Sequence, residues 1–259
     1  MRRVEARYCD RMFDSSEGNY VPGDDPIVVA MTSAIQSGDL AEIDRLLNDH
    51  PWLPTVRIGD PDCHRTLLHA ATDWPGHFPN GPTVVSRLVG SGADVNAHSC
   101  FDAHSETALH WAASTNDVAV LDALLDAGAD LEATGAVLGG GTALADACGF
   151  SNWAAARRLV ERGARTRLKD AAALGMMDRI EESFTRGLTP SDSDVTQAFW
   201  SACKGDQREA CEYLLGRGAD INWLGWDDLT PLDAAEREHA LELAEWLQTL
   251  GAKHAAELR

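Results

Sequence analysis

The segment Thr107-Ala108-Leu109-His110-Trp111-Ala112-Ala113, followed by Gly128-Ala129-Asp130, determines how this chain folds. The hydroxyl of Thr107 suits the cap of a helix start, and the alanines that follow allow close helix packing. Between Val120 and Leu125, apolar side chains recur with the spacing of a second helix. Gly128 then suits a left-handed residue at the end of that helix. The stretch therefore predicts two helices joined by a short turn.

The same two markers recur along the chain. The threonine marker returns at Thr142 and Thr230, and the glycine marker at Gly92, Gly163, Gly218 and Gly251. Thr107, Thr142 and Thr230 each stand 21 residues before a marker glycine, whereas Thr66 stands 26 residues before Gly92. Neighbouring glycines are 33 to 36 residues apart, except across the gap from Gly163 to Gly218. A period of this length is typical of a helical repeat array.

These motifs resemble those of the ankyrin family, whose repeat reads T-P-L-H-x-A and later G-A-D-x-N. The resemblance covers roughly residues 30–253 and implies an all-α solenoid of helix-turn-helix units with short β-hairpin connections. It also implies that His69 and His110, at the motif histidine, bond backbone groups between repeats. We expect about seven repeats, at residues 30–60, 61–97, 98–133, 134–166, 167–190, 191–225 and 226–253.

Three parts of the chain depart from the regular repeat. Residues 1–26, with Gly, Pro, Ser and Asp clusters, are expected to be largely disordered before the repeat domain at 27–253. The fifth repeat is degenerate, because Ala171 follows Gly163 too closely for a full hairpin. We therefore expect a helix pair without a long finger between Gly163 and Gly187. Residues 254–259 are interpreted as a C-terminal tail.

Composition limits the kinds of partner. The formal net charge is −19, which disfavours contact with nucleic-acid phosphates and with anionic membrane surfaces. No membrane span or secretory signal is recognisable, so a cytoplasmic protein is expected. We also expect a monomer. The six cysteines form no CxxC pair, and we expect neither a metal nor a cofactor.

Binding residues are sought where the sequence leaves the repeat pattern. The largest departure is the Trp-, His-, Phe- and Pro-rich stretch 73–82 within the second repeat, which predicts a rigid loop. Such side chains bind well when exposed but equally pack against their own loop. The candidate binding residues are Asp73, Trp74, His77, Phe78, His104, Glu106, Trp111, Ser114, Asp146, Phe150, Trp153, Trp200, Trp226 and Asp227.

Two classes of function remain open on these residues. The first is a module that binds a protein partner through its concave face and hairpin tips, which the family resemblance implies. The second is a small-molecule or catalytic pocket on that face, where a buried Asp146 would need partners or a raised pKa. Its acid–base candidates are Asp73, His77, His104, Glu106 and Asp146, although no signature of a reaction type is present.

Overall fold

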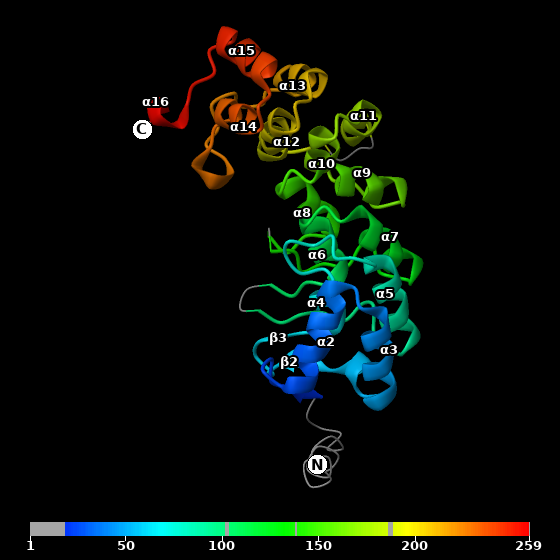
Figure 1. Cartoon of the computed structure of the whole chain (residues 1–259). Helices are drawn as coiled ribbons and strands as arrows, with labels where there is room; N and C mark the ends of the chain where they lie inside the picture. The colour runs from blue at the N-terminus through cyan, green and yellow to red at the C-terminus, as the bar shows by residue number, and fades with distance from the viewer. Residues whose placement is uncertain (1–18, 102–103, 138, 186–188, 259) are drawn as a thin grey trace. The chain divides into compact units, whose positions relative to one another are not determined.

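The computed structural model describes residues 19–101, 104–137, 139–185 and 189–258, and these residues are mostly helical (Figure 1). The chain divides into two compact units, Met1–Ala147 and Cys148–Arg259. Each unit is built from helix pairs. None of the helices in the described ranges is long and apolar enough to cross a membrane.

The first unit has two rows of helices. The inner row contains α2 (Pro26–Ser37), α4 (Leu67–Ala70) and α6 (Ala108–Ser114). The outer row contains α3 (Leu40–Asp49), α5 (Gly81–Gly90) and α7 (Val118–Asp126). Neighbours within each row pack on one another, and α8 (Ala143–Gly149) spans the boundary between the units. Leucine, valine and alanine side chains fill the space between the rows.

Hairpins, called fingers here, precede the inner helices of this unit. A short 3-10 helix, Leu53–Thr55, leads into the first finger, in which β2 (Arg57–Gly59) pairs antiparallel with β3 (His64–Arg65). The second finger pairs His98 with Thr107 and Phe101 with His104. The third turns at Gly139 and Gly140, whose φ values of 75° and 68° favour glycine. Gly139 and Gly140 thus lie at the tip of this hairpin.

The residues just before α2 are ordered, which corrects part of the expectation for residues 1–26. Tyr20–Val21 form strand β1, which pairs parallel with β2 and places Tyr20 opposite Arg57. Asp25 caps α2, because its Oδ1 accepts hydrogen bonds from the backbone N–H groups of Ile27 and Val28. The edge of β2 supplies backbone hydrogen-bond partners for residues 20 and 21. The composition of residues 1–26 does not reveal this pairing. Residues 1–18 lie outside the described residues.

Two buried histidines connect successive repeats. Nδ1 of His69 accepts from the backbone N–H of Thr66 at 3.2 Å, so the proton is on Nε2, which donates to the carbonyl of Glu106 at 2.9 Å. His110 repeats the pattern with Thr107 and the carbonyl of Gly141. Each ring therefore closes the first turn of its own helix and holds the next finger, as the motif predicts.

The loop at residues 73–80 joins the second repeat to both neighbours. The backbone N–H of His77 donates to Oδ2 of Asp117 at 2.7 Å, and its ring Nε2 lies 3.1 Å from the carbonyl of Thr115. In the other direction, Nδ2 of Asn80 donates to the carbonyl of Gly38 at 2.9 Å. The loop therefore links the helix turns of three successive repeats.

The second unit continues the same pairing. After α9 (Trp153–Glu161), its inner row contains α10 (Leu168–Ala173), α12 (Asp192–Lys204) and α14 (Pro231–Arg237). Its outer helices are α11 (Met177–Thr185), α13 (Arg208–Leu215) and α15 (Leu241–Thr249). Alanines line the contact of α10 with α12, where a Cβ on Gly205 would collide with the backbone carbonyl of Ala173. A continuous solenoid of seven repeats stays a prediction.

Connections between helix pairs vary in length within this unit. Only residues 162–167 separate α9 from α10, and no strand forms there. In contrast, residues 216–230 separate α13 from α14 and contain the 3-10 helix η2 (Trp226–Asp228). The connection after Gly163 is thus as short as the sequence indicates; Gly187 itself lies outside the described residues.

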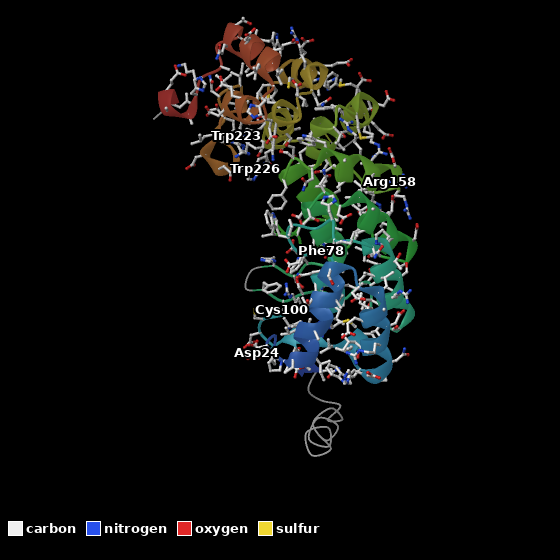
Figure 2. The ribbon with its side chains drawn as sticks, in the orientation of Figure 1. Asp24, Phe78, Cys100, Arg158, Trp223 and Trp226 are labelled. Carbon is white, nitrogen blue, oxygen red and sulfur yellow. The ribbon has the colours of Figure 1, made fainter. Side chains whose placement is uncertain are left out.

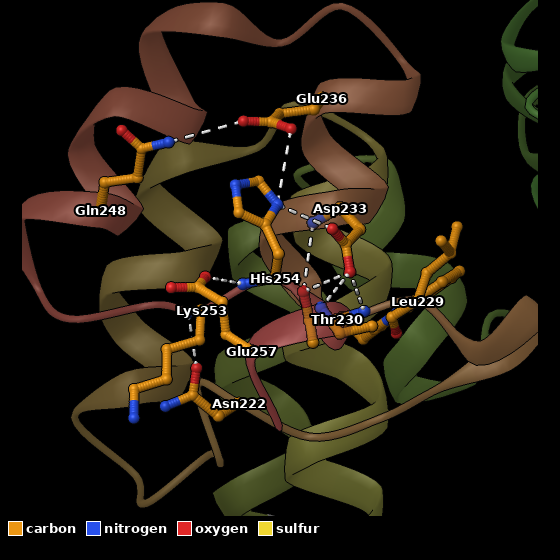
Figure 3. Close-up of polar contacts among 11 residues, drawn as sticks. Asn222, Leu229, Thr230, Asp233, Glu236, Gln248, Lys253, His254 and Glu257 are labelled. Atoms are coloured by element: carbon orange, nitrogen blue, oxygen red, sulfur yellow. Dashed lines mark hydrogen bonds and ion pairs between the residues drawn. The ribbon is translucent and has the colours of Figure 1, made fainter. Parts of the chain in front are cut away.

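The segment interpreted as a tail is ordered and docks on α14 (Figure 3). Ala255–Leu258 form helix α16, and Oδ2 of Asp233 accepts from the backbone N–H of Ala255 at 2.9 Å. Nδ1 of His254 lies 2.8 Å from Oδ1 of Asp233, and this contact raises the pKa of His254. Lys253 N–H also donates to the side chain of Asn222. These bonds hold residues 254–258 against α14.

The buried histidine His69 predicts a loss of stability in acid. Burial lowers the pKa of His69 to about 4 from an ordinary value near 6.5, so between these values the unfolded chain binds more protons than the folded chain. The free energy of unfolding is therefore expected to fall as the pH drops from 6.5, by about 2 kcal/mol at pH 5 from this ring alone. Urea unfolding at pH 7.5 and pH 5 measures this loss. A His69→Asn variant should show a smaller pH effect; an unchanged effect would contradict the assignment.

The anchored loop predicts an unequal effect of two helix-cap mutations. Asp117 caps α7 through Val120 N–H and also holds the backbone of His77, whereas Asp39 only caps α3 through Glu42 N–H. Asp117→Ala should lower the free energy of unfolding, measured with a chemical denaturant, by about 2–3 kcal/mol, and Asp39→Ala should lower it by about 1 kcal/mol. Only Asp117→Ala should speed proteolysis within residues 73–80. Equal costs and equal cleavage would show that the loop is held by other contacts.

Candidate functional site

One group of predicted residues meets beside α6 in the first unit. We call Phe101, His104, Glu106 and Trp111 the finger-base cluster. The ring of Trp111 stacks on Phe101 at a centroid distance of 6.0 Å and meets the edge of His69 at 5.0 Å. Phe101 also lies 5.9 Å from the ring of His104. The second finger and the inner helix therefore present one joined aromatic surface.

Glu106 is the buried polar centre of this cluster. Its Oε2 accepts a hydrogen bond from Nε1 of Trp111 at 3.0 Å and lies 3.0 Å from Nδ1 of His104. Its Oε1 accepts from the backbone N–H of Val137 in the third finger, at 3.4 Å. Buried carboxylates need such partners, and these connect two fingers with an inner helix. Glu106 therefore holds Trp111 and the third finger together.

The five acid–base candidates do not form a single constellation. Asp73 forms an ion pair with Arg65 and accepts from the N–H of Trp74. His77 bonds Thr115 at the loop described above. Asp146 is fully buried in α8. Only His104 and Glu106 adjoin one another.

The other predicted residues of the first unit differ in exposure. The side chain of Trp74 is 82 % exposed, whereas that of Asp146 is fully buried, so the two do not share one surface. Phe78 and Ser114 are half-buried, in the loop and at the end of α6. Trp74 is therefore the most exposed large apolar side chain among the described residues of this unit.

A second aromatic group lies in the second unit. We call Trp200, Trp223 and Trp226 the tryptophan cluster, and Figure 2 labels the last two on the connection before α14. The ring of Trp226 meets the edges of Trp200 and Trp223 at 5.0 and 5.5 Å. Trp200 is buried, and its Nε1 donates to the carbonyl of Leu229 at 2.9 Å. A Cβ on Gly225 would collide with Trp200 and Trp223, so this turn requires glycine.

The cluster leaves part of Trp226 accessible. Its side chain is 41 % exposed, and the neighbouring Leu224 is exposed as well. Asp227, with a φ of 58°, pairs with Arg237 at 2.7 Å, and this contact holds the turn on α14. Of the remaining candidates, Phe150 is exposed after α8 and Trp153 is half-buried at the start of α9.

Lysines beside the tryptophans were not among the predicted residues. The ammonium of Lys169, on α10, lies 4.9 Å from the centre of the Trp226 ring. Nζ of Lys204, at the end of α12, donates to the carbonyls of Cys148 and Gly149. Both pKa values are lowered, chiefly because burial removes water from the ammonium. The sequence could have drawn attention to these two residues because lysine is rare in this chain, which holds only three.

The histidines near the fingers contact neighbouring protein groups. Nε2 of His64 accepts a hydrogen bond from Nη1 of Arg57 at 2.9 Å, and its Nδ1 donates to the carbonyl of Asp60 at 3.1 Å. Nδ1 of His98 lies 2.6 Å from the carbonyl of Ser105. These side chains line a shallow hollow of about 490 Å³ with Tyr20. Among residues 19–101, 104–137, 139–185 and 189–258, no group of three His, Cys, Asp or Glu side chains is placed to hold a metal ion.

Comparison with known proteins identifies the repeat. Residues 78–170 match the family described as ankyrin repeats (3 copies). No curated protein matches the chain. The matched residues include α5 to α9 and the second and third fingers, with the histidine link of His110 to Gly141 inside them. Residues 78–170 therefore form ankyrin repeats.

Proposed function

We propose that this protein binds a protein partner through the concave side of its repeats and the tips of its fingers. Ankyrin repeats are generally protein-interaction modules. The observation that carries the proposal is the exposure of Trp74 and Trp226, which lie on connections rather than in the core. Exposed tryptophans of this kind are enriched among residues that dominate binding energy.

The contacts that hold the segments carrying Trp74 and Trp226 favour binding by a rigid surface. The loop that carries Trp74 is bonded to Asp117 and Gly38, and the turn that carries Trp226 is held by Arg237 and packed on Trp200. A side chain fixed before binding loses less conformational entropy on association. The anchored loops therefore supply preorganised contacts.

Truncation of the exposed tryptophans tests this function. Partners are captured from a lysate of cells that express the protein, identified by mass spectrometry, purified and titrated by calorimetry. Trp74→Ala or Trp226→Ala should weaken the dissociation constant by about 30-fold, as expected for a central aromatic contact.

Leu241 provides the matched control for these variants. Its side chain is 63 % exposed on the outer helix α15, so Leu241→Ala removes a similar apolar contact from the other row of helices. The proposal requires that this variant bind normally. Affinity lost with Leu241→Ala and retained with both tryptophan variants would contradict it, and so would the capture of no protein.

A further inference from the structure

Short connections leave a notch in the second unit. Residues 162–167 are too few to build a finger before α10, and α12 begins at Asp192 soon after α11 ends at Thr185. A hollow of about 430 Å³ lies at the starts of α10 and α12. It is lined by Arg167, Leu168, Lys169, Pro190, Asp194 and Gln197. The first turns of both inner helices are therefore accessible at this hollow.

The charged groups around the notch are paired, with Lys169 the exception. Arg167 binds the carboxylate of Asp170 at 3.0 Å. Asp194 caps its own helix, and its Oδ2 accepts from the N–H and hydroxyl of Ser191. Within the described part of the chain, the Lys169 ammonium has no carboxylate or carbonyl partner, and it lies over the ring of Trp226. A half-buried ammonium in this position can receive a carboxylate.

We propose that the notch binds a peptide segment of the partner protein that carries an acidic side chain next to an apolar one. The carboxylate binds the ammonium of Lys169, and the apolar side chain packs on the exposed part of Trp226. The inference rests on the proposed function and names the chemistry of the partner.

Charge and shape both favour this occupant. The Lys169 ammonium is partly stripped of water, so a carboxylate that pairs with it restores a lost interaction. Trp226 is fixed by Trp200 and Trp223 and still exposes part of its surface. Asp194, on the opposite side of the notch, repels a second acidic residue and so sets the direction of the segment.

A peptide selection tests the inference. Random linear peptides displayed on phage are selected on the immobilised full chain and, in parallel, on Lys169→Gln, Lys169→Arg and Lys253→Gln variants. Lys253 is the matched control, because its side chain is exposed and only its backbone N–H binds Asn222. Circular dichroism and thermal unfolding check that each variant folds.

The expected result is a shared acidic residue beside an apolar one among the peptides enriched on the wild-type chain. In fluorescence titrations, Lys169→Gln should weaken their binding about tenfold, while Lys169→Arg and Lys253→Gln leave it within about twofold. Replacing the acidic residue of the peptide by its amide should weaken binding to the wild-type chain by the same factor of about ten. The amide peptide and the acidic peptide should bind Lys169→Gln equally well.

Other outcomes separate the two proposals. Enriched peptides without an acidic residue, or acidic peptides that bind Lys169→Gln as well as the wild type, overturn the notch assignment and leave the protein-binding function standing. A selection that enriches no peptide on the wild-type chain counts against both.

Discussion

The reciprocal hydrogen bonding at the first turn of each inner helix is the constraint on which the rest of this structure depends. In the first unit, Thr66 and Thr107 cap their helices while His69 and His110 reach back to the same turn. The imidazole has a second nitrogen, and it donates to a carbonyl in the next finger. One histidine side chain thus pairs a backbone N–H group at the helix start that would otherwise lack a partner. The same side chain fixes the spacing between repeats.

Where the histidine is replaced by aspartate, the helix start is still closed but the link to the next repeat changes. Asp170, Asp194 and Asp233 each return a carboxylate oxygen to their own cap residue. A carboxylate accepts and cannot donate to a carbonyl, so the following segment must bring the donors. His254 and the N–H of Ala255 do this at Asp233. Asp170 and Asp194 stand in the first turns of α10 and α12, where the notch beside Lys169 lies.

The long loop at residues 73–80 shows how one sequence feature serves structure and surface together. Its backbone and polar side chains bind the turns of neighbouring repeats, so most of its unusual residues are occupied by the scaffold. Trp74 is the aromatic side chain of this loop with the largest exposed fraction, 82 %. Rigidity and accessibility are therefore combined at one position, and the same combination recurs at Trp226 through its contacts with Trp200 and Arg237.

The sequence by itself determined the repeat pattern, the helix pairs and the short connection after Gly163, because each follows from local capping, helical periodicity and a fixed spacing of markers. The histidine links followed from the resemblance to ankyrin repeats. It also brought forward His104, Glu106 and Trp111, which the structure joins. Only the tertiary structure decided that Asp146 is buried away from Trp74, that residues 19–26 and 254–258 are ordered, and that Lys169 lies over Trp226. These features depend on contacts between segments distant along the chain, whose partners no local pattern specifies.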